Sequence, residues 1–174
     1  MKVLLPVLFI ASLASAAFAA GPAHQHGVAK LDVAVEAGRV TLELDTPLDN
    51  LLGFERAPRS DAERQQADAM VVKLTAAATL FRIDGAAGCT LDKVTLTSAA
   101  LGLGPSAVAE KDGHGELEGR FEFSCKDGTR AGFIEVGLFE AFAPLKRIEL
   151  QVVSSKGQMK ATLVRPASRV ALVR

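Results

Sequence analysis

Three histidines are the residues of this sequence best suited to bind a metal ion. His24 and His26 stand two positions apart, just before the first alternating apolar stretch, and side chains two apart in an extended chain point to the same side. Zinc prefers four ligands, with imidazole nitrogens at about 2.0–2.1 Å, so this pair needs further ligands. We expect them from the later stretch DGHGE, which supplies His114 together with Asp112 or Glu116. The alternative is that the pair belongs to a solvated tail.

Other patterns that carry chemistry are missing from the sequence. It has no nucleophile elbow, no phosphate-binding glycine loop and no H-E-x-x-H, so we expect no enzyme. Trp and Tyr are absent, which removes the usual stacking platforms for bases and sugar rings. Twenty Lys+Arg balance 20 Asp+Glu, and removal of Lys2 with a leader leaves a net charge of about −1. This balance argues against a nucleic-acid partner or an anionic membrane surface, because both call for a basic patch.

The N-terminus has the pattern of a secretory signal peptide over residues 1–19. Lys2 supplies a positive start, residues 3–14 are apolar, and Ala17-Phe18-Ala19 gives a cleavage signal. No later segment approaches 18 uninterrupted apolar residues. We therefore expect a soluble, exported protein with a single domain over residues 20–174. Its first residues, 20–27, are expected to be loosely held because they contain Gly and Pro and lack apolar anchors.

The two cysteines, Cys89 and Cys125, are an even number in a chain that we expect to be exported. An oxidising compartment favours one disulfide between them. Two buried thiols, or a zinc site that uses both, are the alternatives. The alternation around Cys125 places it on the apolar face of its strand, so the disulfide would join core elements.

The periodicity of the chain predicts an α+β domain in which helices pack on one face of an antiparallel sheet. Strict alternation over 28–45 predicts a hairpin with one solvated face. Ser60 and Glu63 form a capping box ahead of a long amphipathic helix over about 60–80. Further elements are strands at 90–98, 116–125 and 130–136, a short helix in 137–145 that Pro144 ends, and a second hairpin over 146–164. The order suggests two similar halves, each with a hairpin followed by a helix and a strand.

Several stretches, taken together and in order, resemble the ZrgA-like family of exported bacterial proteins linked to zinc uptake. The stretches are HQHGVAKLDVAVEAGRVTLELDTPLDNLLGFE, GC at 88–89, FEFSC at 121–125, LFEAF at 138–142 and IELQVVSSKGQ at 148–158. The likeness covers essentially the whole mature chain.

The resemblance implies a periplasmic zinc-binding accessory protein that captures zinc for an uptake transporter or its binding protein. Family members carry histidines in the H-x-H-G segment, here His24 and His26, and in a loop between the cysteine-bearing strands, where His114 remains with Asp112 and Glu116. Many relatives also have a histidine after G-F-E, a position that Arg56 occupies here. A structural or interaction module that keeps the fold without metal is the alternative.

Overall fold

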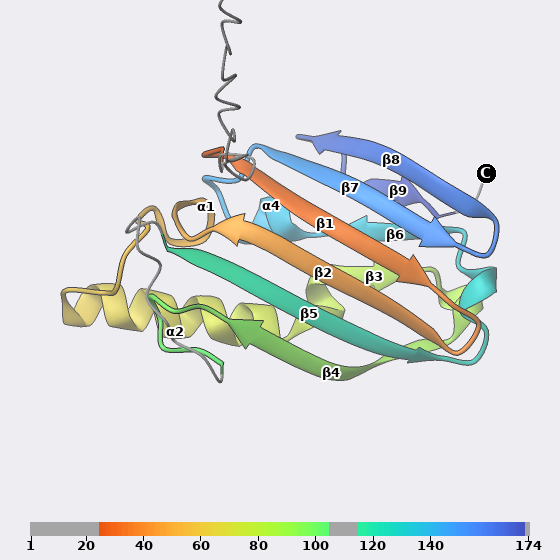
Figure 1. The fold of residues 1–174 in the computed structure, drawn as a ribbon, viewed down its shortest axis with the longest axis horizontal. Coiled ribbons are helices and arrows are strands. Elements are labelled where there is room, and N and C mark those ends of the chain that lie inside the picture. Colours follow the sequence, from red (N-terminus) through yellow and green to blue (C-terminus); the bar gives the residue numbers. More distant parts are fainter. Residues whose placement is uncertain (1–24, 105–114, 173–174) are drawn as a thin grey trace, which may run out of the picture.

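The computed structural model describes residues 25–104 and 115–172. The predicted signal peptide and three of the predicted ligands, His24, Asp112 and His114, lie outside the described residues. The fold is α+β, and it is built from two sheets and a few helices (Figure 1). No helix in the described part of the chain combines the length and the apolarity that crossing a bilayer requires.

The larger sheet has six strands in the order β4-β5-β2-β1-β7-β8. Both predicted hairpins are confirmed, since β1 pairs with β2 and β7 pairs with β8 in antiparallel register. The predicted antiparallel sheet is confirmed, with one exception inside the sheet, where β1 and β7 run parallel with Val28 opposite Arg147. The strands are β1 (Val28–Val35), β2 (Arg39–Pro47), β4 (Cys89–Thr97), β5 (Glu116–Cys125), β7 (Arg147–Ser154) and β8 (Gly157–Val164).

A second layer covers one face of this sheet (Figure 1). It contains a three-stranded sheet of β3 (Phe81–Ile83), β6 (Phe133–Val136) and β9 (Arg169–Ala171). It also contains the helices α1 (Asp49–Leu52), α2 (Asp61–Thr75), α3 (Ala77–Leu80) and α4 (Leu138–Ala141). The predicted strand at 130–136 is β6, and the predicted short helix in 137–145 is α4. The other strands of the small sheet and α1 were not predicted, because segments this short rarely show a period. The idea of two similar halves stays a hypothesis.

The long predicted helix is α2, and its capping residue is confirmed. The Ser60 hydroxyl accepts a hydrogen bond from the backbone N–H of Glu63 at 3.2 Å. The helix ends at Thr75, and α3 follows as a separate turn instead of continuing it to residue 80. Ala67, Met70 and Leu74 face the core, which fixes α2 against the sheet.

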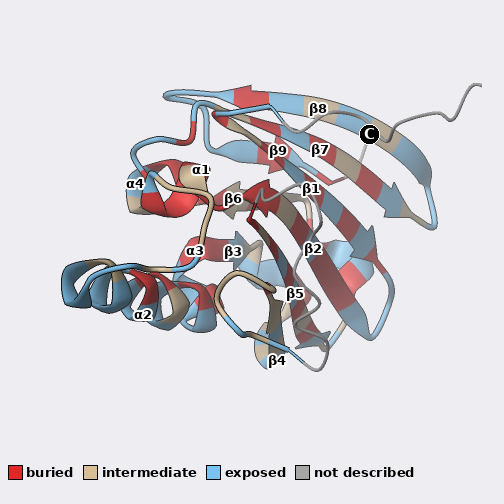
Figure 2. Cartoon of the chain, turned by 60° about the vertical axis from the view of Figure 1, so that its left-hand side comes forward, coloured by how far each residue is buried: buried red, intermediate tan, exposed pale blue. Residues whose placement is uncertain are grey.

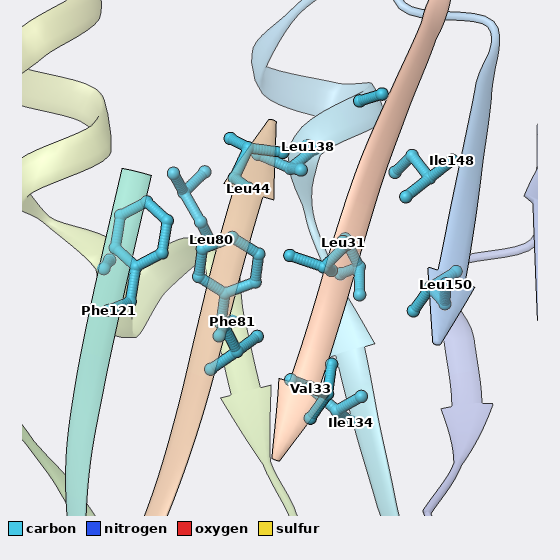
Figure 3. Packing of buried hydrophobic residues seen from close by; sticks show 14 of the residues in the cluster. Leu31, Val33, Leu44, Leu80, Phe81, Phe121, Ile134, Leu138, Ile148 and Leu150 are labelled. Atoms are coloured by element: carbon cyan, nitrogen blue, oxygen red, sulfur yellow. The ribbon is translucent and has the colours of Figure 1, made fainter. Parts of the chain in front are cut away.

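The hydrophobic core fills the space between the two layers (Figure 3). Leu31 on β1, Leu44 on β2 and Phe121 on β5 point from the sheet toward Phe81 and Leu138. The rings of Phe81 and Phe121 meet with their centroids 4.9 Å apart, a favourable tilted arrangement. Alternate residues of the strands point to the opposite face, which is open to solvent and charged, as the single-sided alternation predicted (Figure 2).

The predicted disulfide joins Cys89 and Cys125. These residues are directly opposite one another in β4 and β5, with Cα atoms 3.9 Å apart, and both pack half-buried against the core. The disulfide closes the end of β5 that is farthest from Glu116, the first residue of the strand. This bond excludes the two alternatives, because neither sulfur is left as a thiol or a metal ligand.

Candidate metal centre

The segment that carries His26 is fixed by its backbone. The N–H of Val28 donates to the carbonyl of Gln25 at 3.0 Å, which closes a turn, and Gly27 sits in that turn with φ of +80°. The carbonyl of Gly27 accepts from the backbone N–H groups of Lys146 (2.8 Å) and Arg147 (2.9 Å) at the start of β7. The expectation of a loosely held segment is therefore wrong for residues 25–27, because a neighbouring strand anchors them. Residues 20–24 lie outside the described part.

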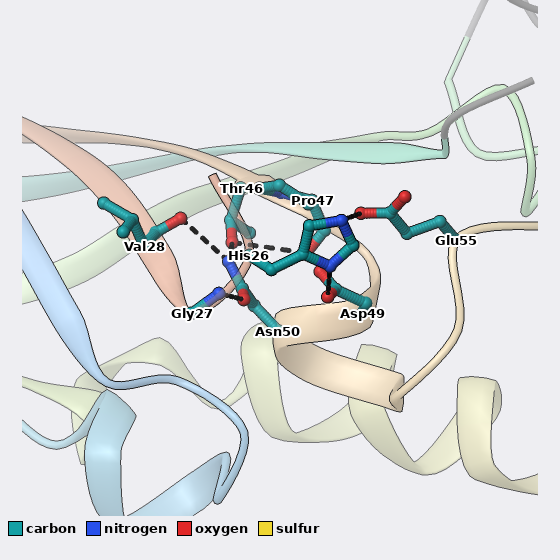
Figure 4. Close-up of polar contacts among 8 residues, drawn as sticks. All are labelled: His26, Gly27, Val28, Thr46, Pro47, Asp49, Asn50 and Glu55. Atoms are coloured by element: carbon teal, nitrogen blue, oxygen red, sulfur yellow. Dashed lines mark hydrogen bonds and ion pairs between the residues drawn. The ribbon is translucent and has the colours of Figure 1, made fainter. Parts of the chain in front are cut away.

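Asn50 fastens the same turn from the other side. Its side chain is fully buried, and its Oδ1 accepts the N–H of Gly27. Its Nδ2 donates to the carbonyl of Val28 at 2.8 Å and to the hydroxyl of Thr46 at 3.0 Å (Figure 4). One amide thus connects the start of β1, the end of β2 and α1.

Two carboxylates flank His26. Asp49 begins α1 directly after β2, and Glu55 follows α1 in the connection to α2. The backbone carbonyl of Glu55 accepts the N–H of Gly115 at 2.7 Å, and Gly115 in turn accepts from Leu48 at 2.9 Å. The start of β5 is therefore held against the segment that carries both acids.

The imidazole of His26 lies between these carboxylates (Figure 4). Its Nδ1 is hydrogen-bonded to Oδ2 of Asp49, and its Nε2 lies 3.7 Å from Oε1 of Glu55. One ligand atom from each of the three residues lies within 4.8 Å of the other two. The His26 side chain is 68% exposed, whereas those of Asp49 and Glu55 are 19% and 15% exposed. The centre is thus a shallow site with acidic walls and an open imidazole.

The donor set and its spacing suit zinc. Two ligands of a tetrahedral zinc ion lie about 3.3–3.4 Å apart, close to the 3.7 Å between Nε2 of His26 and Oε1 of Glu55. Asp49 approaches Nδ1 within hydrogen-bonding contact, which matches a carboxylate that orients a metal-binding histidine. Its other oxygen, Oδ1, is buried and finds no hydrogen-bond partner among the described residues. Such an oxygen is costly to bury, and a nearby cation would lower that cost.

Arg56 braces the segment that carries Glu55. Its guanidinium donates two hydrogen bonds of 2.8 Å to the carboxylate of Glu63 on α2 and lies 5.1 Å from the ring centroid of Phe54. The bonds from Arg56, together with the N–H of Arg59, lower the pKa of Glu63 to about 2. Many relatives are expected to have a histidine at this position. Here the arginine instead binds Glu63 on α2.

Of the five predicted ligands, the structure describes His26 and Glu116. His26 lies beside Asp49 and Glu55, whereas Glu116 lies at the start of β5 opposite Pro47 and outside this group. Metal binding by His26, Glu116, His24, Asp112 and His114 stays a prediction. The sequence analysis did not identify Asp49 and Glu55, because they lie between the predicted hairpin and the predicted long helix, where the chain shows no period. The presence of two acids in this short connection was the only available signal.

Comparison with known proteins identifies a family whose model covers the residues of this centre. No curated protein matches the sequence at a significant level. The family model described as ZrgA family zinc uptake protein matches residues 23–172, which is most of the chain and includes His26, Asp49 and Glu55. The chain therefore belongs to the ZrgA family of zinc uptake proteins.

Proposed function

We propose that this protein is an exported, periplasmic zinc-binding accessory that captures zinc for uptake. The observation that carries the proposal is the meeting of His26, Asp49 and Glu55 from three separate positions of the chain in one exposed site. Membership of a zinc uptake family and the leader-like N-terminus support it. The disulfide between Cys89 and Cys125 suits an oxidising compartment.

In this proposal Nε2 of His26 and the carboxylate of Glu55 bind zinc directly. Asp49 holds the Nδ1–H of the ring, which fixes the tautomer that presents Nε2 to the metal. The remaining coordination positions of the zinc are taken by water and by the predicted ligands His24 and His114, with Asp112 or Glu116 as a further ligand. Because the turn at 25–27 is already ordered, zinc binding costs little conformational entropy at His26.

The exposure of the imidazole suits a site that binds zinc and then releases it to another protein. A structural zinc site is closed by four protein ligands, whereas this site leaves His26 68% exposed, so ligand exchange does not require unfolding. We propose that the zinc passes to an uptake transporter or to its binding protein. The role is binding and delivery without catalysis.

Calorimetric titration of the mature, metal-free protein with zinc tests the proposal. We expect one saturable site that is weakened at least tenfold in His26→Ala and in Glu55→Gln. Glu118→Gln, on the open face of the sheet, is the matched control and should bind like the wild type. No saturable binding by the wild type, or equal binding by His26→Ala, would contradict the proposal and leave the metal-independent module as the better description.

A further inference from the structure

We propose that Asn50 is a positioning residue of the zinc centre, which it serves through His26 and Asp49 without contacting the metal. The inference rests on the proposed function. It concerns how the site is preorganised, and it begins from a buried polar side chain that the ligand set does not use.

Both polar atoms of the buried Asn50 amide are hydrogen-bonded. It is 0% exposed, and its oxygen and nitrogen make three hydrogen bonds, to the N–H of Gly27, the carbonyl of Val28 and the hydroxyl of Thr46. A buried amide without partners is costly, so these three contacts hold the side chain in one orientation. The orientation also fixes the backbone of residues 27 and 28.

The position of Asn50 links this anchor to the ligands. His26 is the residue before Gly27, and Asp49 is the residue before Asn50. Two hydrogen bonds join these dipeptides: the inner bond runs from the N–H of Gly27 to Asn50, and the outer bond joins His26 and Asp49. The inner bond therefore sets the separation and direction at which the imidazole meets its carboxylate (Figure 4).

The chemistry of an amide is needed at this position. The N–H of Gly27 requires an acceptor, whereas the carbonyl of Val28 and the hydroxyl of Thr46 are approached by a donor. Asparagine offers both on one short side chain, and neither an aspartate nor an apolar residue can do so. Small displacements of a ligand are enough to weaken a metal site, because the geometry must hold within about 0.5 Å.

The test compares Asn50→Ala with Gln66→Ala as the matched control. Gln66 also uses its amide to hold α1, by donating to the carbonyl of Leu52 at 2.8 Å, but its hydrogen bond does not involve residues 26–28. Thr46→Val is a milder second variant that removes one acceptor of the Asn50 amide and keeps the side-chain volume. If Asn50→Ala does not fold, Thr46→Val takes its place, and it should change the His26 tautomer and the zinc affinity in the same direction.

Two readouts separate positioning from stability. The first is the imidazole ¹H–¹⁵N spectrum of the zinc-free protein near pH 8, in which His26 is assigned by its loss in His26→Ala. The wild type should show the Nδ1–H tautomer, and Asn50→Ala should show a mixture of tautomers. The second is the dissociation constant for zinc, measured against a chromophoric chelator. It should rise about 10–100-fold in Asn50→Ala and stay unchanged in Gln66→Ala.

The outcomes distinguish this inference from the proposed function. If folded Asn50→Ala keeps both the tautomer and the zinc affinity of the wild type, the inference is overturned. Equal changes in Gln66→Ala would also overturn it, since the effect would then be general loosening of α1. If the wild type does not bind zinc but its His26 signals still depend on Asn50, the positioning stands and the proposed function fails.

Discussion

His26 and Asp49 are 23 residues apart in the sequence, yet Nδ1 of the imidazole is hydrogen-bonded to Oδ2 of the carboxylate. The contact follows from the turn before β1 and from the start of α1 directly after β2, which bring both residues to one end of the sheet (Figure 4). It leaves Nε2 directed toward Glu55. The ring is thus held by one carboxylate and presented to the other.

The first prediction concerns the carboxylate of Asp49. Asp49→Asn keeps an oxygen that can accept the Nδ1–H but removes the charge that makes the imidazole a better ligand. We expect zinc affinity to fall about 10–100-fold with little change in thermal stability. Competition with a chromophoric chelator measures the affinity. Asp61→Asn, at an 88% exposed side chain on α2, is the control and should bind zinc like the wild type.

The second prediction separates the disulfide from the metal centre. Replacing both Cys89 and Cys125 by serine should lower the free energy of unfolding by about 3–4 kcal/mol, because the bond constrains the unfolded chain. Zinc affinity should not change while the protein is folded, since β5 separates Cys125 from the Glu116 end by roughly 30 Å. Urea unfolding and a zinc titration of the same sample measure the two quantities. A loss of affinity in the folded variant would show that the two ends are coupled.

The third prediction uses the carboxylate of Glu135, which bridges the small sheet. Hydrogen bonds from Arg169 and then from Arg82 hold the pKa of this carboxyl below its usual value. A lowered pKa in the folded state means that Glu135 stabilises the fold at pH values above the ordinary carboxyl range, and that the contribution is lost as the pH falls. Glu135→Gln should therefore reduce the melting temperature at neutral pH, and the difference should shrink on acidification. The exposed Glu140→Gln is the control, and a difference that grows toward low pH would contradict the assignment.

The fourth prediction is that acid releases zinc while the brace beside the site is still intact. Protons and zinc compete for the imidazole nitrogen, so zinc binding should weaken as the pH falls. The ion pair of Arg56 and Glu63 persists to much lower pH, because the pKa of Glu63 is about 2. A titration from about pH 8 to 5, with far-ultraviolet circular dichroism beside it, should show zinc loss without loss of helix. Simultaneous loss of both would mean that acid disrupts the fold at the site.

The sequence predicted those parts of the structure that depend on local patterns. The period of two identified β1, β2, β4, β5, β7 and β8, and Ser60 identified the start of α2. The short elements β3, β9 and α1 carry too little pattern to be found.

The candidate centre was predicted only at His26. Its partners Asp49 and Glu55 are ordinary acids in a stretch with no period, and their approach to His26 depends on long-range contacts. These are the parallel pairing of β1 with β7 and the buried amide of Asn50. A motif of two histidines cannot indicate which distant carboxylates complete it.

The central claim is that zinc binds at His26 and Glu55, and anomalous diffraction tests it most directly. Crystals of the mature protein with one equivalent of zinc would be measured on both sides of the zinc absorption edge. The account predicts one strong anomalous peak within bonding distance of Nε2 of His26 and a carboxylate oxygen of Glu55, with Asp49 still bonded to Nδ1. A principal zinc peak elsewhere, for example beside the carboxylates of the charged open face of the sheet, would contradict it.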